Sequence, residues 1–243
     1  MRWPNRAALD RLLANRIQPV VTRSGRVLRL APARAGSENA SAGYESRIYQ
    51  NGELPTRETS WHDLFNLLVW LTFPQAKAAL NQRHCSEPRA IGAANGRTAT
   101  ADALTLFDES GVIVASTDAA LLELLRRFAW KELFWRKRAE AVERMRFVVF
   151  GHGLYQQALD PFVGMTGKAL LLHVAEDFVA TPVEEQLAHL DERTAEEISS
   201  NTRFLGTHEL APLPILGVPG WTPENALPAY YDNTDYFRSG RRE

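Results

Sequence analysis

The spacing of apolar and polar positions changes along the chain, from helical in the first third to strand-like in the middle. Residues 7–16 carry apolar side chains at the spacing of one helix face, and residues 44–50 predict a second helix. The stretch 61–73 is apolar on almost every side of a helix, which is typical of a buried one. The first 95 residues are therefore expected to form a mainly helical layer.

The predicted buried helix has recognisable start signals and unusual polar positions. Ser60 followed three residues later by Asp63 resembles a capping box, and Pro74 suits the first turn of a following helix. His62, Asp63 and Asn66 then lie inside an apolar pattern. They must find hydrogen-bond partners or serve a site, because an unpaired buried polar group costs about 1 to 3 kcal/mol.

The middle of the chain reads as strands separated by helical segments. Residues 103–107 and 112–115 predict a β-hairpin around the turn at 108–111. Further apolar strands are expected at 147–150 and 169–173, with helices between them. The order β-β-α-β-α-β predicts an α/β fold with a mixed sheet, α+β being the alternative, since strands joined through helices usually lie parallel.

The last part of the chain combines an acidic helix with a proline-rich tail. Residues 183–199 predict an exposed acidic helix. From residue 211 onward five prolines prevent long regular structure, while aromatic side chains supply apolar area for a strap packed on the body. We expect one domain over 1–243, made of a helical layer (1–95), a mixed α/β core (100–180) and the acidic helix with the packed tail (181–243).

Charge and cysteine content narrow the partners and the compartment. The formal net charge of −1 argues against a nucleic-acid-binding protein. Basic side chains gather in 1–34 and 126–146, which could attract an anionic partner or form solvated faces neutralised by the acidic segment 176–209. The only cysteine, Cys85, cannot form an internal disulfide, and no apolar run approaches the roughly 20 residues needed to span a bilayer. A cytoplasmic protein without membrane contact is expected.

Several sequence blocks together resemble a known family. The blocks are GELPTR at 52–57, WHDLFN at 61–66, ALTLFDE at 103–109, FGHGLY at 150–155, TGKA at 166–169 and LGVPGW at 216–221. They extend over residues 44–238 and resemble the bacterial domain-of-unknown-function family numbered 3025. Two departures are Arg97 and Asp102, which stand apart where a neighbouring pair is expected, and Ser110 in place of a frequent Asn. The resemblance implies no established activity.

Three residues form the candidate catalytic set. His152 lies between two glycines after an apolar strand, and the carboxyl end of a strand is a common ligand position in α/β proteins. The glycines would let the backbone approach a substrate. Together with His62 and Asp63, His152 could act in acid/base chemistry or hold a zinc, iron or manganese ion. No recognised metal motif is present, so a core histidine bonded to Asp63 or to a backbone carbonyl is the alternative for His62.

Four further residues are candidate ligand-binding positions: Asn66, Asp108, Tyr155 and Lys168. Asp108 and Glu109 at the expected hairpin tip could supply oxygen ligands, although Asp in a turn more often bonds its own backbone. Lys168 could bind an anionic group, but the surrounding sequence departs from a phosphate-binding loop, and we find no nucleotide motif.

Two classes of function fit these observations. The first is a hydrolase-like enzyme that uses acid/base or metal chemistry at His152 with His62 and Asp63. The second is a non-catalytic binding or assembly protein that uses the basic and aromatic faces. Convergence of the three side chains on one pocket favours the enzyme, and separate side chains bonded to backbone favour the binding protein.

Overall fold

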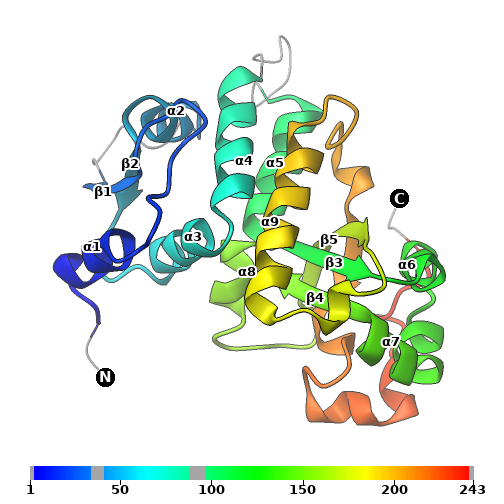
Figure 1. Cartoon of the computed structure of the whole chain (residues 1–243). Coiled ribbons are helices and arrows are strands. Elements are labelled where there is room, and N and C mark those ends of the chain that lie inside the picture. The colour runs from blue at the N-terminus through cyan, green and yellow to red at the C-terminus, as the bar shows by residue number, and fades with distance from the viewer. Residues whose placement is uncertain (1–2, 34–40, 88–96, 241–243) are drawn as a thin grey trace. The chain divides into compact units, whose positions relative to one another are not determined.

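The computed structural model describes residues 3–33, 41–87 and 97–240, which fold into helices and two sheets (Figure 1). The expected α/β class is confirmed. The chain forms two compact units. The first unit comprises residues 1–105 and 187–207, and the second comprises 106–186 and 208–243. The expectation of one domain over 1–243 stays a prediction.

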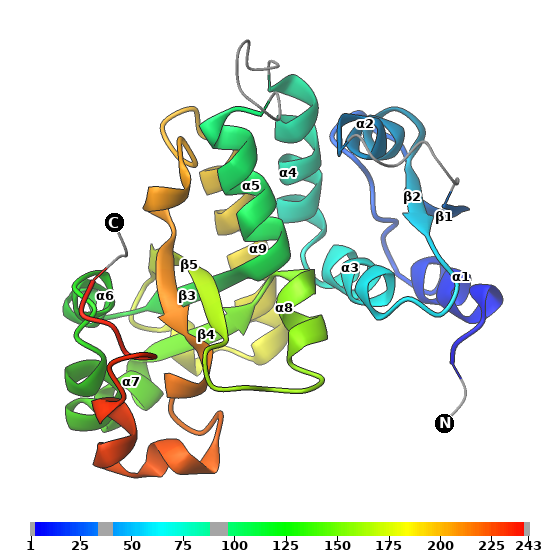
Figure 2. The ribbon, with the colours of Figure 1, turned by 180° about the vertical axis from the view of Figure 1, so that it is seen from behind.

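Helices dominate the first unit, as the sequence predicts. Its elements are α1 (Arg6–Ala14), β1 (Arg29–Pro32), α2 (Ser41–Asn51), β2 (Glu53–Thr56), α3 (Trp61–Thr72), α4 (Pro74–Ser86) and most of α9 (Val183–Ser199). The strands β1 and β2 pair in parallel as a two-stranded sheet, which Figure 2 shows between α1 and α2. The helices expected at 7–16, 44–50 and 61–73 are confirmed.

Helix α3 begins as predicted but is exposed along one narrow side. The Ser60 hydroxyl accepts a hydrogen bond from the Asp63 backbone N–H at 3.3 Å, and Pro74 is the first residue of α4. Leu67 and Trp70 are almost fully buried in the core of the first unit, whereas Leu68 is 38% exposed. Burial on all sides was therefore the wrong expectation, because Trp61, Leu68 and Thr72 form an exposed strip along the helix.

Helices α4 and α9 lie alongside each other and satisfy each other's terminal backbone groups (Figure 1). The Asp191 carboxylate accepts hydrogen bonds from the backbone N–H groups of Gln75 at 3.0 Å and Ala76 at 2.8 Å. The Arg83 guanidinium donates to the carbonyls of Ile198, Ser200 and Arg203. Both ends would otherwise carry unpaired backbone groups. Helix α9 has the predicted bounds but is not simply exposed, because Asp191 and Ile198 lie on a buried face.

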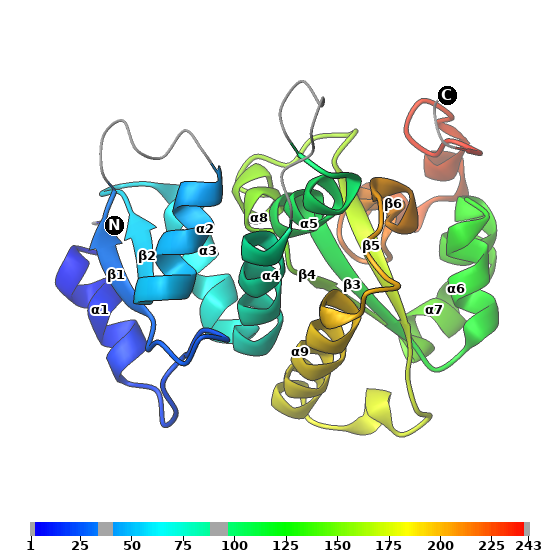
Figure 3. The ribbon, with the colours of Figure 1, turned by 90° about the horizontal axis from the view of Figure 1, so that it is seen from above.

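A four-stranded mixed sheet forms the centre of the second unit (Figure 3). Its order is β4-β3-β5-β6, with β3 parallel to β5 and both edge strands antiparallel to their neighbours. The strands are β3 (Gly111–Ser116), β4 (Met145–Val149), β5 (Thr166–His173) and β6 (Ala211–Pro214). The mixed sheet is confirmed, but β3 and β4 are antiparallel although helices connect them.

Short helices and the tail cover one face of this sheet. The helices are α6 (Ala119–Arg126), the π-helical turn η1 (Glu132–Arg136), α7 (Arg138–Arg144) and α8 (His152–Gln157). Phe134 packs there with the tail residues Tyr231, Tyr236 and Phe237, which are at most 7% exposed. The Tyr231 hydroxyl donates a hydrogen bond to the Gly217 carbonyl at 3.0 Å. The predicted strap is thus confirmed, and β6 adds an edge strand to it.

The expected hairpin at 103–115 is wrong, because its first half is helical. Helix α5 (Ala99–Ser110) runs directly into β3 at Gly111. The buried residues Ala103, Leu104 and Phe107 follow the spacing of a helix face, and the Thr98 hydroxyl accepts a hydrogen bond from the Ala101 N–H at the helix start. A Cβ atom on Gly111 would lie 2.3 Å from the Phe107 carbonyl oxygen, so the direct transition requires glycine.

Candidate functional site

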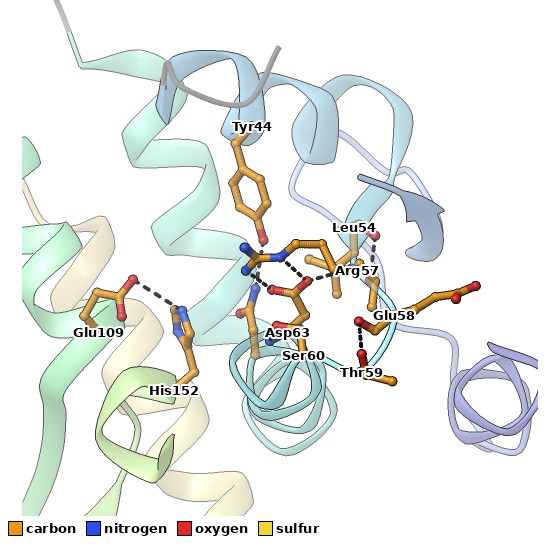
Figure 4. A network of polar contacts seen from close by, with 11 residues as sticks. Tyr44, Leu54, Arg57, Glu58, Thr59, Ser60, Asp63, Glu109 and His152 are labelled. Atoms are coloured by element: carbon orange, nitrogen blue, oxygen red, sulfur yellow. Dashed lines mark hydrogen bonds and ion pairs between the residues drawn. The ribbon is translucent and has the colours of Figure 1, made fainter. Parts of the chain in front are cut away.

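A buried histidine lies between two carboxylates at one end of the four-stranded sheet. His152 is the first residue of α8, and its side chain is 3% exposed. Asp108 and Glu109 belong to the last turn of α5. The His152 Nδ1 atom lies 3.7 Å from Asp108 Oδ1, and its Nε2 atom lies 3.5 Å from Glu109 Oε1. Figure 4 shows the Glu109 carboxylate directed at the imidazole ring.

The glycines on either side of His152 allow this approach. A Cβ atom on Gly151 would lie 2.4 Å from the Gly111 backbone nitrogen, and one on Gly153 would lie 2.9 Å from the Glu109 carbonyl oxygen. These distances are shorter than real Cβ contacts, so only glycine fits at either position. The sequence interpretation had the glycines approaching a substrate. In the structure they let the start of α8 approach the end of α5.

Negative charge surrounds the imidazole of His152. Two carboxylates occupy the carboxyl end of α5, where the helix dipole already contributes negative partial charge. The two nitrogen–oxygen separations exceed the usual hydrogen-bond length, so the attraction is that of charges close to each other. The Asp108 side chain is 14% exposed and that of Glu109 is 42% exposed, so the centre is reached from the Glu109 side.

Tyr155 and Lys168 also belong to the second unit. The Tyr155 hydroxyl donates to the Val149 carbonyl at 2.9 Å, and burial raises the pKa of this phenol. That bond fixes the ring one helical turn beyond His152. Lys168 lies on β5, where it pairs in register with Gly111. It lines a cavity whose lining includes neither Tyr155 nor His152.

Asp63 is bound by an arginine that sequence analysis did not single out. Its carboxylate accepts hydrogen bonds from the Arg57 backbone N–H at 2.6 Å, from Nε at 2.9 Å and from Nη2 at 2.7 Å (Figure 4). Burial raises the pKa of the Asp63 carboxyl, but the hydrogen bonds and charge of Arg57 outweigh it and leave the pKa below its usual value. Asp63 therefore holds the turn between β2 and α3. The sequence signal that could have indicated this contact is Arg57 itself, an arginine three residues before the helix-capping Ser60.

Asn66 and His62 complete the set predicted on α3. The Asn66 side-chain nitrogen donates to the Tyr44 hydroxyl at 2.8 Å, and its carbonyl oxygen is buried without a hydrogen-bond partner among the described residues. His62 is partly buried on the first turn of α3. His62, Asp63 and Asn66 belong to the first unit, and His152 belongs to the second. Their convergence on one cavity stays a prediction.

Comparison with known proteins identifies the family. No curated protein and no solved structure matches the chain. Across the described parts of the chain, no helix has the length and apolar character that crossing a bilayer requires. The family model described as a protein of unknown function, DUF3025, matches residues 28–241. The resemblance found in the sequence blocks is thereby confirmed, and the chain belongs to the DUF3025 family.

Proposed function

We propose that the protein is a hydrolase-like enzyme whose chemistry is centred on His152. In this proposal Glu109 and the Nε2 atom of His152 bind a divalent metal ion. Asp108 lies behind the ring, with its Oδ1 atom 3.7 Å from Nδ1, and places a negative charge on that side of the imidazole. All three residues belong to the second unit.

The observation that carries the proposal is the spacing of the ligand atoms. Two ligands of a tetrahedral zinc ion, each about 2.0 to 2.1 Å from the metal, lie about 3.4 Å from each other. The separation of 3.5 Å between His152 Nε2 and Glu109 Oε1 fits that value and is too long for a good hydrogen bond. A carboxylate on the opposite ring nitrogen, here Asp108 at 3.7 Å, is the usual companion of a metal-binding histidine.

The residues around a metal ion at this position determine the chemistry that it could support. A divalent ion bound there would polarise a carbonyl or phosphoryl oxygen and lower the pKa of a bound water. Glu109, partly exposed, faces the side from which a substrate arrives. Asp108, largely buried, keeps the neutral His152 in the tautomer that presents Nε2 as a ligand. Catalytic zinc sites use three protein ligands, and the sequence hypothesis names His62 as a further one.

Metal analysis of the purified full chain tests the proposal. We expect zinc, manganese or cobalt to bind in a one-to-one ratio, measured by elemental analysis after dialysis and by the visible absorption of the cobalt form. Glu109→Gln should abolish this binding, and Asp108→Asn should weaken it about 10- to 100-fold. Glu140→Gln is the matched control, because Glu140 is an exposed carboxylate that pairs with Lys137 on α7. A His62→Ala variant in the same assay tests the additional ligand.

Hydrolysis assays separate the enzyme from a merely metal-binding protein. p-Nitrophenyl acetate and p-nitrophenyl phosphate report ester and phosphate hydrolysis, and the rate should follow metal occupancy in every variant. If His152→Ala lowers stability while the wild type binds no divalent metal and hydrolyses neither probe, His152 is a structural residue and the enzyme proposal fails.

The second candidate is a binding or assembly protein, and one feature of the first unit favours it. Trp3 packs edge-on against Trp61 with ring centres 4.6 Å apart, and Trp61 stacks on Phe65, although Trp61 remains 45% exposed. Arg6 and Arg57 line a neighbouring cavity of about 770 Å³. Salt-sensitive retention on a heparin column, lost in Arg6→Gln, would support an anionic partner.

We further propose a cytoplasmic location, which the single cysteine supports.

A further inference from the structure

A cavity of the second unit lies apart from the residues of the His152 centre. It has a volume of about 520 Å³ and is lined by the end of α6, by β5 and β6, and by the C-terminal tail. Figure 2 shows the tail running beside α6, and the Trp130 Nε1–H donates to the Arg238 carbonyl at 2.7 Å. The segment after α6, the strands β5 and β6 and the tail therefore line a space large enough for a small organic molecule.

The floor of the cavity is one face of the β5–β6 pair. Every second residue of β5 lines it, from Gly164 before the strand to Thr166 and Lys168, together with Pro212 and Pro214 of β6. Side chains two residues apart share one face of a sheet, so the side chain of Lys168 is on the cavity side. The residues between them, such as Leu213, belong to the apolar core on the other face.

Aromatic rings form the walls, and their polar atoms are already bonded. Phe128 and Trp130 meet edge to face with ring centres 5.7 Å apart. The Tyr236 hydroxyl donates to the Met165 carbonyl and accepts from the Leu216 N–H. Because the Trp130 and Tyr236 polar atoms are used elsewhere, these rings offer a ligand apolar surface.

Phe128 has a backbone conformation that normally requires glycine. Its φ is +59°, and it lies just beyond α6, where its N–H bonds to the Leu125 carbonyl and the Ala129 N–H bonds to the Leu124 carbonyl. This is the Schellman arrangement, in which glycine is usual at the position of Phe128. A bulky residue there is disfavoured by its Cβ atom, and such outliers gather at ligand sites. In this conformation Phe128 lines the cavity.

The charged groups at the cavity favour an anion. Lys168 and Arg238 are the basic lining residues and Asp235 is the acidic one. Arg238 is exposed, and it forms no ion pair with any residue that the structure describes. Its Nε donates to the Asp235 backbone carbonyl, which leaves the outer guanidinium nitrogens for a planar acceptor.

From these contacts we infer that the cavity binds a planar aromatic anion, a ring system that carries a carboxylate or a phosphate. The ring lies between the aromatic walls, and the anionic group is bound by Lys168 and Arg238. This site is independent of the metal centre proposed at His152, since none of its lining residues belongs to that centre.

Binding of three naphthalene probes to the full chain tests the inference. 2-Naphthoate and 2-naphthyl phosphate should bind at about 1 mM or below, measured by saturation-transfer NMR, and the neutral 2-naphthalenemethanol should bind about tenfold more weakly. Lys168→Met and Arg238→Gln should each weaken anion binding about tenfold. Lys137→Met is the matched control, because it removes the same charge on α7 outside the cavity, and it should change nothing.

A substitution of Phe128 tests the aromatic wall of the cavity. Phe128→Gly places the preferred residue at the end of α6, so the chain should remain folded in a thermal melt while all three probes lose affinity. The inference is overturned if neither anion binds, if the neutral probe binds as well as the anions, or if Lys137→Met weakens binding as much as Lys168→Met. Removing metal with a chelator should leave probe binding unchanged, which separates this site from the proposed enzyme function.

Discussion

Asp191 should make the stability of the first unit depend on pH. Its carboxylate is 3% exposed and accepts two backbone hydrogen bonds at the start of α4. Burial raises the pKa of Asp191 to about 6, although the N–H groups of Ala76 and Gln75 and the charge of Arg16 act in the opposite direction. Ionisation of this group is therefore harder in the folded chain than in the unfolded chain.

The magnitude follows from the difference between the two states. A carboxyl pKa of about 6 in the folded chain, against 3.8 as the reference, corresponds to about 3 kcal/mol. Because the folded pKa is the higher one, the folded state binds more protons. The contribution is fully present below the unfolded pKa and is lost as the pH rises through the folded pKa.

Urea denaturation of the wild type and Asp191→Asn between about pH 4 and pH 8 measures this contribution. The asparagine does not ionise and keeps one acceptor oxygen for the N–H groups of Gln75 and Ala76. Relative to the wild type, the variant should therefore gain about 2 to 3 kcal/mol as the pH rises over this range. Asp191→Ala does not ionise either, but it lacks both hydrogen bonds, so its unfolding free energy should lie about 1 to 2 kcal/mol below that of Asp191→Asn at every pH. A difference between wild type and Asp191→Asn that is constant with pH would refute the reasoning.

Three further predictions concern packing and charge. Leu67→Ala should cost about 2 to 5 kcal/mol of unfolding free energy in denaturant melts, whereas Leu68→Ala, at a 38% exposed side chain, should cost below about 1 kcal/mol; equal losses would contradict the observed face of α3. Asp63→Asn should cost about 1 kcal/mol near neutral pH, because Arg57 is half exposed, and the cost should shrink as acid protonates Asp63 in the wild type. Truncation after Leu210 removes β6 and the strap, and it should yield aggregated protein; a soluble product with an unchanged melting temperature would show that the strap is dispensable.

Sequence signals near a helix terminus predicted where helices begin better than they predicted which side chains are buried. Ser60 marks a helix start through a hydrogen bond to a neighbour in sequence and Pro74 through its ring, and the structure contains both. The exposure of Leu68 was not predictable in this way, because it depends on which layer covers α3. The burial of Asp191 likewise depends on α4, more than 100 residues earlier in the chain.

The sequence also did not identify the residues that contact the candidate site residues, because those contacts come from distant segments or from residues that the sequence analysis did not single out. His152 was found because its two glycines are unusual after a strand, and the structure explains them by the close approach of Glu109. Asp63 was named for a site, but three hydrogen bonds from Arg57 give it a structural role. The sequence showed which polar residues lie within apolar segments. It did not show which partner each one has.

The misassigned hairpin changes the chemistry that His152 can perform. In the predicted hairpin, Asp108 and Glu109 belong to the turn, where an Asp side chain usually bonds its own backbone. In a helix, consecutive side chains are separated by about 100°, and the last turn of α5 directs both carboxylates at the same ring. Asp108 Oδ1 then lies 3.7 Å from Nδ1 and Glu109 Oε1 lies 3.5 Å from Nε2, so the two carboxylates face opposite nitrogens of one imidazole. The helical geometry of α5 is thus what makes a metal or acid/base role for His152 chemically reasonable.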